Sequence, residues 1–426
     1  MKRSLQSRRI DLPGRRVILP AAFALLLLCD EAIAQDRRPE ESWPKAAPEA
    51  IGLVPTNLAD LDADVAREKF GLLDSMLVIR CGTVGFERSY SRDYRQIYGE
   101  AAQKKGPQNQ DPHGQYNYFS TEFHPLYRGS NLHTMQSVTK TITSVTIGIA
   151  VTRGDFPVDL NTPVLKFFEN QKIANIDDRK RRMTLRNLMT MTTGLEWHED
   201  LAQMDPKNSV NIMEASHDWV RYTIDQPMAS EPGSVWMYNS GAAQVLSHIF
   251  TRVTGKRIDE YAAEYLFKPL NIRYHWKLTP TGLPDTEGGL YLSPRDLAKI
   301  GYLFLKNGKW DGKQIVSAEW VKASVTPQVT TGEGSAQYGY MWWLHPYGNS
   351  PVRFAWAAHG FGQQHLVILP DYEWIIVVTG WDILPSDKDR ESGWLERMLS
   401  TVDKRRTCAS NENKSSSESP RSSTMP

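Results

Sequence analysis

A serine and a lysine stand three residues apart at Ser137 and Lys140. A serine hydroxyl becomes a nucleophile when a neighbouring group takes its proton, and a lysine amine can do this if its surroundings keep it uncharged. The two side chains can meet only on a helix, because residues three apart share a helix face but point to opposite faces of a strand. The spacing alone is a weak signal: Ser42 and Lys45 repeat it, but Pro44 predicts an extended chain there.

The segment 137–151 gives two conflicting signals about its secondary structure. Valine, isoleucine and threonine dominate it, which favours a strand. The segment is also longer than a usual buried strand of about 4–8 residues. We therefore predict a buried helix with Ser137 in its first turn, where free N–H groups would stabilise an oxyanion, and with a polar stripe of Ser137, Lys140, Thr141 and Ser144. A helix start whose lysine only extends toward solvent is the alternative.

The first 34 residues have the features of an export signal. A basic start precedes the apolar run Val17 to Leu28, and Ala32-Ile33-Ala34 is typical of a cleavage site. The apolar run is too short to span a bilayer comfortably. We predict a signal peptide over 1–34, a periplasmic or secreted mature protein and no stable membrane insertion, with the Sec and twin-arginine routes both open.

Charge and cysteine content narrow the function classes. The 426-residue chain has 50 Lys and Arg against 49 Asp and Glu, for a net charge of +1. Removal of the leader changes this to about −2, and a nearly neutral body without a basic stripe argues against a nucleic-acid partner. Only Cys81 and Cys408 remain after cleavage, and with Cys408 in an expected unstructured tail we predict no disulfide framework.

Strand patterns at both ends of the chain flank a mostly helical middle. The apolar patterns predict strands near 74–81 and 83–90, and again at 353–357, 365–369 and 374–379, with a helix over 294–307 whose apolar positions are Leu297, Ile300, Leu303 and Phe304. One sheet should therefore take strands from both ends. We predict a hydrolase domain over 35–403, with an α/β lobe at about 49–135 and 286–403, a helical lobe at about 136–285, and an unstructured tail at 404–426. The aromatic-rich segment 92–128 is either a lid or a packed surface loop.

Two other segments offer groups that serine chemistry needs. Tyr238 precedes a predicted helix and could pass a proton if it lies near the lysine, although a packed aromatic side chain is the simpler explanation. His359, Gly360 and Phe361 lie between two predicted strands, where glycine permits close backbone approach and a strand-edge N–H could complete an oxyanion hole. His359 either faces a ligand or is an ordinary turn residue. The chain lacks a Gly-x-Ser-x-Gly elbow, and its ten histidines show no zinc spacing, so we expect no metal and no cofactor.

Four motifs, in this order, resemble those of class C β-lactamase-related serine hydrolases. This family includes penicillin-binding DD-peptidases, family VIII carboxylesterases and 6-aminohexanoate-dimer hydrolases, and the resemblance covers roughly Glu49 to Val402. Several ordered motifs together are far more specific than any one. The motifs are Ser137-Val-Thr-Lys140, the segment Leu188 to Leu195, the segment Pro232 to Gly241, and the segment Gly288 to Leu297.

The resemblance implies a fold and a set of roles. The implied fold class is α+β, an antiparallel sheet flanked by helices with an inserted, mostly helical lobe. Ser137 would be the acylated nucleophile, Lys140 its base and Tyr238 the proton shuttle to the leaving group. The oxyanion would lie between the backbone N–H groups of Ser137 and Phe361.

Two departures from the family pattern bear on the substrate. Ser240 stands where β-lactamases have the asparagine of Tyr-x-Asn, and Ala358-His359-Gly360 lacks the lysine of Lys-Thr-Gly. Both changes favour a small-molecule ester or linear amide, and Gly-Phe-Gly-Gln-Gln at 360–364 is similar to the aminohexanoate-dimer hydrolase branch.

Several alternatives stay open. Glu199 and Glu287 stand beside family motifs and either line the substrate cleft or are exposed acids. A β-lactamase or D-alanyl-D-alanine carboxypeptidase, and a non-catalytic binding protein of the same fold, are the competing functions. The sequence indicates no oligomeric state.

Overall fold

The computed structural model describes residues 43–347, 351–384, 393–402 and 408. These residues belong to one compact unit that spans Pro39–Pro426. The signal peptide predicted over 1–34 lies outside the described residues, as does the predicted tail apart from Cys408. Within the described ranges, no helix has the length and apolar character needed to cross a bilayer.

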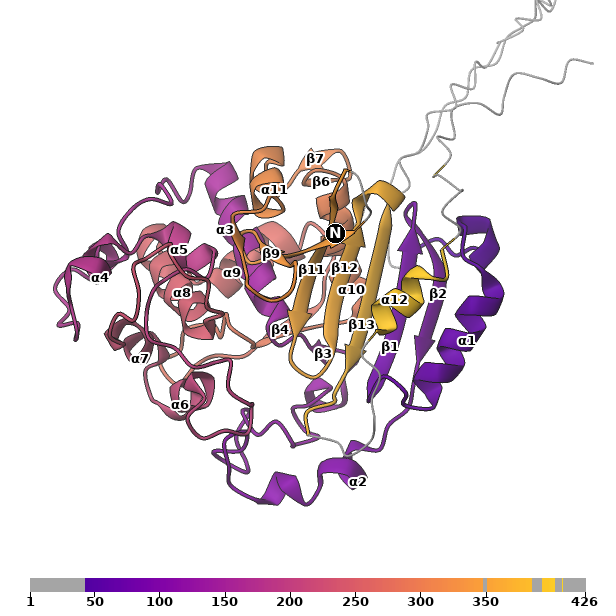
Figure 1. Cartoon of the computed structure of the whole chain (residues 1–426), viewed down its shortest axis with the longest axis horizontal. Coiled ribbons are helices and arrows are strands. Elements are labelled where there is room, and N and C mark those ends of the chain that lie inside the picture. Colours follow the sequence, from indigo (N-terminus) through magenta and orange to yellow (C-terminus); the bar gives the residue numbers. More distant parts are fainter. Residues whose placement is uncertain (1–42, 348–350, 385–392, 403–407, 409–426) are drawn as a thin grey trace, which may run out of the picture. The chain divides into compact units, whose positions relative to one another are not determined.

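An antiparallel sheet of eight strands forms the centre of the unit (Figure 1). β1 pairs with β13, with Val78 opposite Ile376, so strands from the two ends of the chain lie side by side as predicted. The spatial order is β2-β1-β13-β12-β11-β10-β9-β8. Their bounds are β1 Leu73–Arg80, β2 Thr83–Ser89, β8 Val329–Thr330, β9 Gln337–Tyr338, β10 Trp343–Tyr347, β11 Arg353–Gly360, β12 Gln364–Leu369 and β13 Trp374–Gly380.

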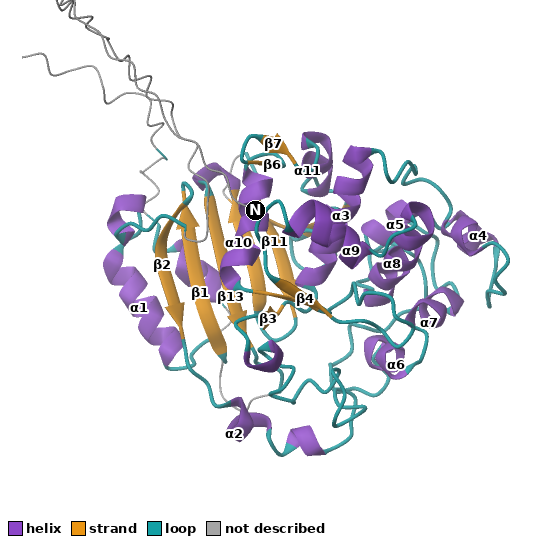
Figure 2. Ribbon diagram, turned by 180° about the vertical axis from the view of Figure 1, so that it is seen from behind, coloured by secondary structure: helices purple, strands orange, loops and turns teal. Residues whose placement is uncertain are grey.

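Helices cover both faces of this sheet, because its strands alternate apolar side chains between the two sides. Met76 and Val78 pack with α1 (Pro55–Ala66) and α12 (Trp394–Leu399). Leu77 and Ile79 point the other way, into the larger core with α3 (Val138–Arg153) and α10 (Pro294–Leu305). Figure 2 shows α10 on this second face. The four apolar positions predicted for the helix over 294–307 are all fully buried.

The segment after Ser137 is a helix, as its length predicted and its β-branched composition did not. Every residue of α3 from Val138 to Ala150 is buried, so tertiary packing decides its conformation. Gly148 is needed because a Cβ there would lie 2.2 Å from a ring atom of Trp320. Ser137 is the N-cap residue with φ −61° and ψ −9°, and its hydroxyl makes no capping bond, which leaves it available for chemistry.

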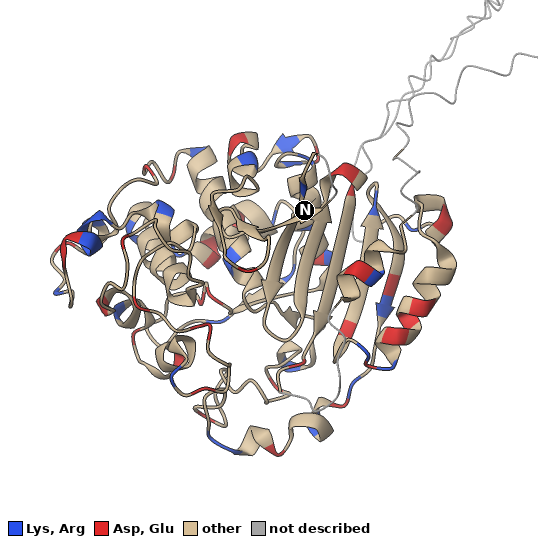
Figure 3. Ribbon diagram, viewed as in Figure 1, with Lys and Arg blue, Asp and Glu red and all other residues tan. Residues whose placement is uncertain are grey.

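The middle of the chain is mostly helical and lies beside the sheet (Figure 1). Its helices are α4 Asp178–Arg182, α5 Leu185–Met189, α6 Ser209–Ala215, α7 Trp219–Asp225, α8 Ser240–Thr254 and α9 Ile258–Ala262. The remaining elements are α2 Tyr94–Tyr98, α11 Ala318–Ser324, the small sheet of β3 His133–Thr134, β5 Leu290–Leu292 and β4 Tyr274–Trp276, and the pair β6 Lys309–Trp310 and β7 Lys313–Gln314. In Figure 3, basic and acidic residues are interspersed along most of these elements.

The segment 92–128 packs onto the body of the protein through its aromatic side chains. Tyr98, Tyr118 and Phe119 form a cluster with Trp381, and the Trp381 indole N–H donates to the backbone oxygen of Tyr118 (3.0 Å). The side chain of Gln115 donates to the backbone oxygen of Leu278 (2.8 Å). These contacts are those of a packed loop, the second of the two alternatives for this segment.

The two cysteines, for which we predicted no disulfide framework, form a single disulfide bond. Cys81, in the turn between β1 and β2, is bonded to Cys408 across 327 residues of sequence. The sequence could not reveal this pair, because Cys408 follows the last helix in a stretch with no pattern of regular structure. The bond ties the end of the described chain to an edge of the sheet.

Candidate active site

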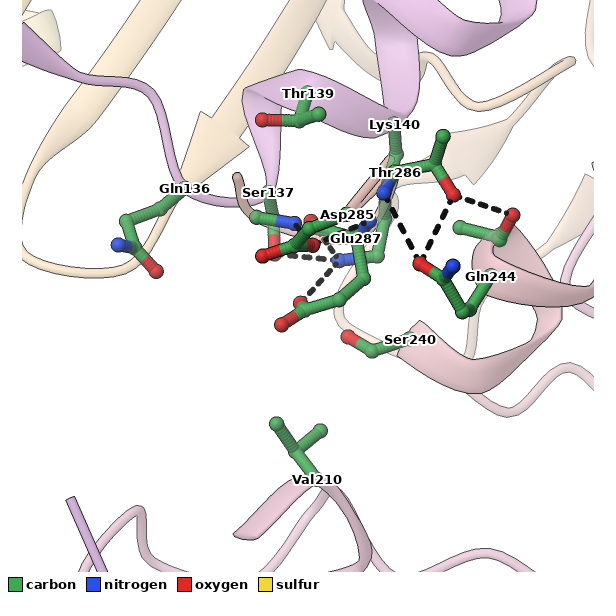
Figure 4. Close-up of polar contacts among 12 residues, drawn as sticks. Gln136, Ser137, Thr139, Lys140, Val210, Ser240, Gln244, Asp285, Thr286 and Glu287 are labelled. Carbon is green, nitrogen blue, oxygen red and sulfur yellow. Dashed lines mark hydrogen bonds and ion pairs between the residues drawn. The ribbon is translucent and has the colours of Figure 1, made fainter. Parts of the chain in front are cut away.

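The start of α3 brings a hydroxyl and an amine together. Lys140 Nζ lies 2.7 Å from Ser137 Oγ and also donates to the backbone oxygen of Glu287 at 2.8 Å (Figure 4). Lys140 is 1 % exposed, so these contacts form out of reach of bulk water. The helical spacing therefore places the amine where it can take the hydroxyl proton.

The backbone just before Ser137 is held in an uncommon conformation against the end of β11. Gln136 has φ +46°, which places a non-glycine residue in the left-handed region beside Ser137. A Cβ on Gly360 would lie 2.5 Å from the Met135 backbone oxygen and 3.1 Å from Gln136 Cβ. Only glycine therefore permits this approach of the strand to the loop.

The close approach of β11 brings two N–H donors to the site. The β10 ladder on β11 ends at Ala357, which leaves the last residues of β11 unpaired on that side. Among the described residues, neither the Ser137 N–H nor the Phe361 N–H donates to another group of the chain. The oxyanion role that the resemblance implies for these two N–H groups stays a prediction.

The ring of Tyr238 lies close to the Lys140 amine. Lys140 Nζ is 5.1 Å from the centre of the Tyr238 ring, and the phenol forms a hydrogen bond with Ser137. Burial and the nearby carboxylate of Glu199 raise the pKa of Tyr238, and the bond with Ser137 opposes this only in part. Tyr238 is therefore a neutral phenol at neutral pH, able to donate a proton.

Glu199 and Ser240, both predicted as substrate-binding residues, bind one another. The Ser240 backbone N–H and hydroxyl donate to the two carboxyl oxygens of Glu199 at 2.7 and 2.6 Å, and the Trp197 indole N–H donates to Glu199 at 2.8 Å. Burial raises the pKa of Glu199, while the charge of Lys140 and the bond from Ser240 lower it. The contacts hold the first turn of α8, and with it Tyr238 two residues earlier, at the site.

Glu287 lies behind Lys140. Its carboxylate oxygen is 3.5 Å from Nζ, and the residue is 5 % exposed, so it is not an exposed acid, and its predicted place in the substrate cleft stays a prediction. Asp285 shapes this turn, because its Oδ1 accepts the N–H groups of Glu287 (3.2 Å) and Gly288 (2.9 Å). Burial, together with the charge of Glu287, raises the pKa of Asp285 to about 6.

His359 makes its hydrogen bonds with two other histidines. It lies within β11, and its two ring nitrogens are each 2.8 Å from a nitrogen of His345 or His365. Burial and the two neighbouring imidazoles hold the pKa of His359 well below its usual range, so the ring is neutral. It therefore supplies no cation at the position where the family pattern has Lys-Thr-Gly.

Sequence reasoning missed several buried polar groups beside the site, of which Glu214, Lys277 and Asp285 are the most prominent. Glu214 belongs to the short helix α6, and its carboxyl accepts a hydrogen bond from the Tyr118 phenol. Lys277 is 1 % exposed, and its Nζ lies 4.4 Å from the centre of the Tyr116 ring. The sequence gives one sign of these groups: Asp285 and Glu287 are two acids separated by a single residue, and they come just before a buried strand.

Two further features bear on what the site can hold. The described residues contain no cluster of three or more His, Cys, Asp or Glu side chains suited to a metal ion. A cavity of about 1270 Å³ is lined by residues such as Asp74, His133 and Lys299, but Ser137 is not among its lining residues. That cavity is therefore separate from the Ser137 site.

Gly360→Ala should slow acylation of Ser137, because its Cβ would push β11 and the Phe361 N–H away from the nucleophile. We expect the rate of labelling by a fluorophosphonate probe to fall by about 10²-fold, the scale of losing one oxyanion donor. Gly106→Ala is the matched control, since no atom lies within 4 Å of a Cβ at that position. Equal labelling rates in the two variants would show that the end of β11 takes no part.

Comparison with known proteins agrees with this geometry. The sequence profile of the family described as Beta-lactamase matches residues 116–391, more than half of the chain. The 6-aminohexanoate-dimer hydrolase of Paenarthrobacter ureafaciens is 25% identical over 247 residues, which cover 53% of this chain and 60% of that protein. The match thus spans less than two thirds of that relative's length.

Two solved structures are similar in fold. EstCE1, described as a hydrolase with promiscuous acyltransferase activity, superposes with a TM-score of 0.60 at 13% identity, covering 83% of this chain and 99% of EstCE1. A D-stereospecific amidohydrolase from Streptomyces sp. superposes with a TM-score of 0.55 at 14% identity, covering 83% and 99% of the two chains. The expected family is therefore confirmed: this chain belongs to the beta-lactamase family of serine hydrolases.

Proposed function

We propose that the protein cleaves a carboxylic ester or linear amide through an acyl-enzyme on Ser137. The observation that carries the proposal is the 2.7 Å contact between Ser137 Oγ and the buried amine of Lys140. In its neutral form, that amine takes the hydroxyl proton as Oγ attacks the substrate carbonyl carbon. The N–H groups of Ser137 and Phe361 bind the oxyanion that forms.

Collapse of the tetrahedral intermediate requires a proton for the leaving group. The neutral phenol of Tyr238 donates it and regains a proton from the Lys140 ammonium, which restores the amine. Water then attacks the acyl-enzyme by the same route and releases the carboxylic acid. The raised pKa of Tyr238 supports a role as acid rather than as a resting phenolate base.

The catalytic roles predict a graded loss of turnover. Ser137→Ala should abolish hydrolysis of p-nitrophenyl butyrate, and Lys140→Ala and Tyr238→Phe should each lose at least ~10²-fold in kcat/KM. Lys45→Ala, from the second Ser-x-x-Lys spacing, and Tyr265→Phe serve as matched controls. Near-normal turnover in Lys140→Ala or Tyr238→Phe would remove that residue from the mechanism.

Three features support an ester or amide as the substrate. Ala358 is buried in the core with α3, and the neutral His359 follows it, so neither provides a cation for a substrate carboxylate. Trp343 stacks on Tyr238 with ring centres 5.9 Å apart, which gives the proton donor an apolar neighbour. The relative from P. ureafaciens is named 6-aminohexanoate-dimer hydrolase, and two aminohexanoate units join through an amide.

The substrate class predicts a preference that two chromogenic assays can measure. We expect kcat/KM for p-nitrophenyl butyrate to exceed that for nitrocefin, because the enzyme lacks the lysine of Lys-Thr-Gly. A higher value for nitrocefin would instead favour the β-lactamase alternative. Failure of a fluorophosphonate to form any adduct with folded protein would favour the non-catalytic binding protein.

We also propose that the chain is exported with removal of residues 1–34. The pattern of the leader and the bond between Cys81 and Cys408 both support this, because disulfides persist in oxidising compartments. The full chain, expressed with its leader in a bacterium, should yield a periplasmic protein that begins at Gln35 and has no free thiol. Intact mass and thiol titration measure both. Retention of the leader or two free thiols would contradict the proposal.

A further inference from the structure

Three histidines form a row across the neighbouring strands β10, β11 and β12. His359 lies between the other two, with its Nε2 2.8 Å from His345 Nε2 and its Nδ1 2.8 Å from His365 Nδ1. His365 Nε2 extends the row to the side-chain oxygen of Gln363 at 3.0 Å. Side chains thus join three strands at the end of β11.

The histidine row lies on the face of the sheet that α1 and α12 cover. Ala357, two residues before His359, packs in the core on that face, whereas Ala358 packs with α3 on the other face. The ring centres of His365 and Trp394 of α12 are 5.0 Å apart. The row therefore supports the end of β11 from the side opposite α3.

The histidine row reaches a part of β11 that the β10 ladder does not. The last backbone pair between these two strands is at Ala357. His345 reaches His359 beyond that pair, through its ring. Phe361 follows His359 by two residues, so a displacement of the His359 backbone would carry the Phe361 N–H with it.

All three hydrogen bonds of the row can form without any charge. Each contact between two ring nitrogens needs one proton, and so does the contact with the Gln363 oxygen, which only accepts. Three neutral imidazoles supply one N–H group for each contact. The sixth ring nitrogen, His345 Nδ1, has no bond to any described group, so one further proton can bind there with all three contacts kept. A second further proton would set two N–H groups against each other and break a contact.

The charges around the row favour His345 as the ring that takes the further proton. Burial lowers the pKa of His345, but the charge of Glu396 on α12 opposes this effect. Burial and the neighbouring imidazoles lower the pKa of His365 to about 3 and hold that of His359 well below its usual range. Within the described residues, the titratable groups that act on the row are the three histidines themselves and Glu396.

We propose that His345, His359 and His365 hold the end of β11 beside the Ser137 loop as a hydrogen-bonded row that carries at most one positive charge. This inference rests on the proposed function, because the strand so held presents the Phe361 N–H to the oxyanion. His359 is a positioning residue that acts through that N–H. The row is complete at neutral pH, and it breaks when a second proton binds as the pH falls toward about 3.

Variants at the outer histidine test the effect of the row on acylation. His345→Ala removes the bond to His359, so the rate of fluorophosphonate labelling at pH 8 should fall by about 10-fold or more, because the oxyanion donor moves. His345→Gln keeps an uncharged N–H donor toward His359, and its rate should return to within about threefold of the unmodified protein. His217→Ala, at an exposed position, is the matched control. Equal rates in His345→Ala and His217→Ala, or no recovery in His345→Gln, would overturn the proposal.

Nitrogen NMR of the histidine rings tests the row without reference to turnover. In folded Ser137→Ala protein labelled with ¹⁵N-histidine, couplings across the hydrogen bonds should connect His359 with both His345 and His365 at pH 8. As the pH is lowered, His345 should be the first of the three rings to take up a proton. Absent couplings, or earlier protonation of His359 or His365, would overturn the inference. If the row gives these signals but the unmodified protein forms no fluorophosphonate adduct, the proposed hydrolysis fails and the row stands.

Discussion

A buried contact between an amine and a hydroxyl is the interaction on which the site depends. Burial of a lysine is costly unless oxygen atoms surround its amine. Here Lys140 Nζ has Ser137 Oγ on one side and the backbone and carboxylate oxygens of Glu287 on the other. The turn that presents Glu287 is as necessary as α3, because without it the amine would lack two of its partners.

Two glycines allow the close backbone contacts on which the site depends. Asp285 closes the turn before β5, and a Cβ on Gly289 would lie 2.6 Å from Asp285 Cβ. Gly360 allows β11 to touch the loop before Ser137 in the same way. At Gly360 two separate backbone segments thus approach more closely than a side chain would allow, whereas Gly289 permits a tight turn within one segment.

The sequence predicted those strands and helices whose apolar residues recur at a regular spacing or form a long run. Alternating apolar residues located β1, β12 and β13, and the length of the apolar run outweighed the strand propensity of valine and threonine in α3. Ser137 and Lys140 could be paired because their spacing has meaning within a single helix. The family resemblance, rather than spacing, pointed to Tyr238 and Phe361, and their catalytic roles remain proposals.

Contacts between distant segments could not be predicted in this way. Glu199 accepts its hydrogen bonds from Ser240, which lies 41 residues further along the chain, and no local pattern records that contact. Cys408 finds Cys81 across nearly the whole chain. His359 contacts two histidines of the neighbouring strands: His365 is its register partner on β12, whereas His345 of β10, whose register partner is Ala355, reaches it through its ring. The close spacing of Asp285 and Glu287 just before a buried strand was the one local sign of a buried charged turn.

The pairing of β1 with β13 has a consequence for the chain during its synthesis. The strand nearest the N-terminus acquires its central neighbour only when residues 374–380 have left the ribosome. Contacts so distant in sequence form slowly, since a long loop must close first. Ser137 and Lys140 are therefore synthesised long before β11, β12 and β13. The eight-stranded sheet, in which β13 separates β1 from β12, can be completed only after this last strand has emerged.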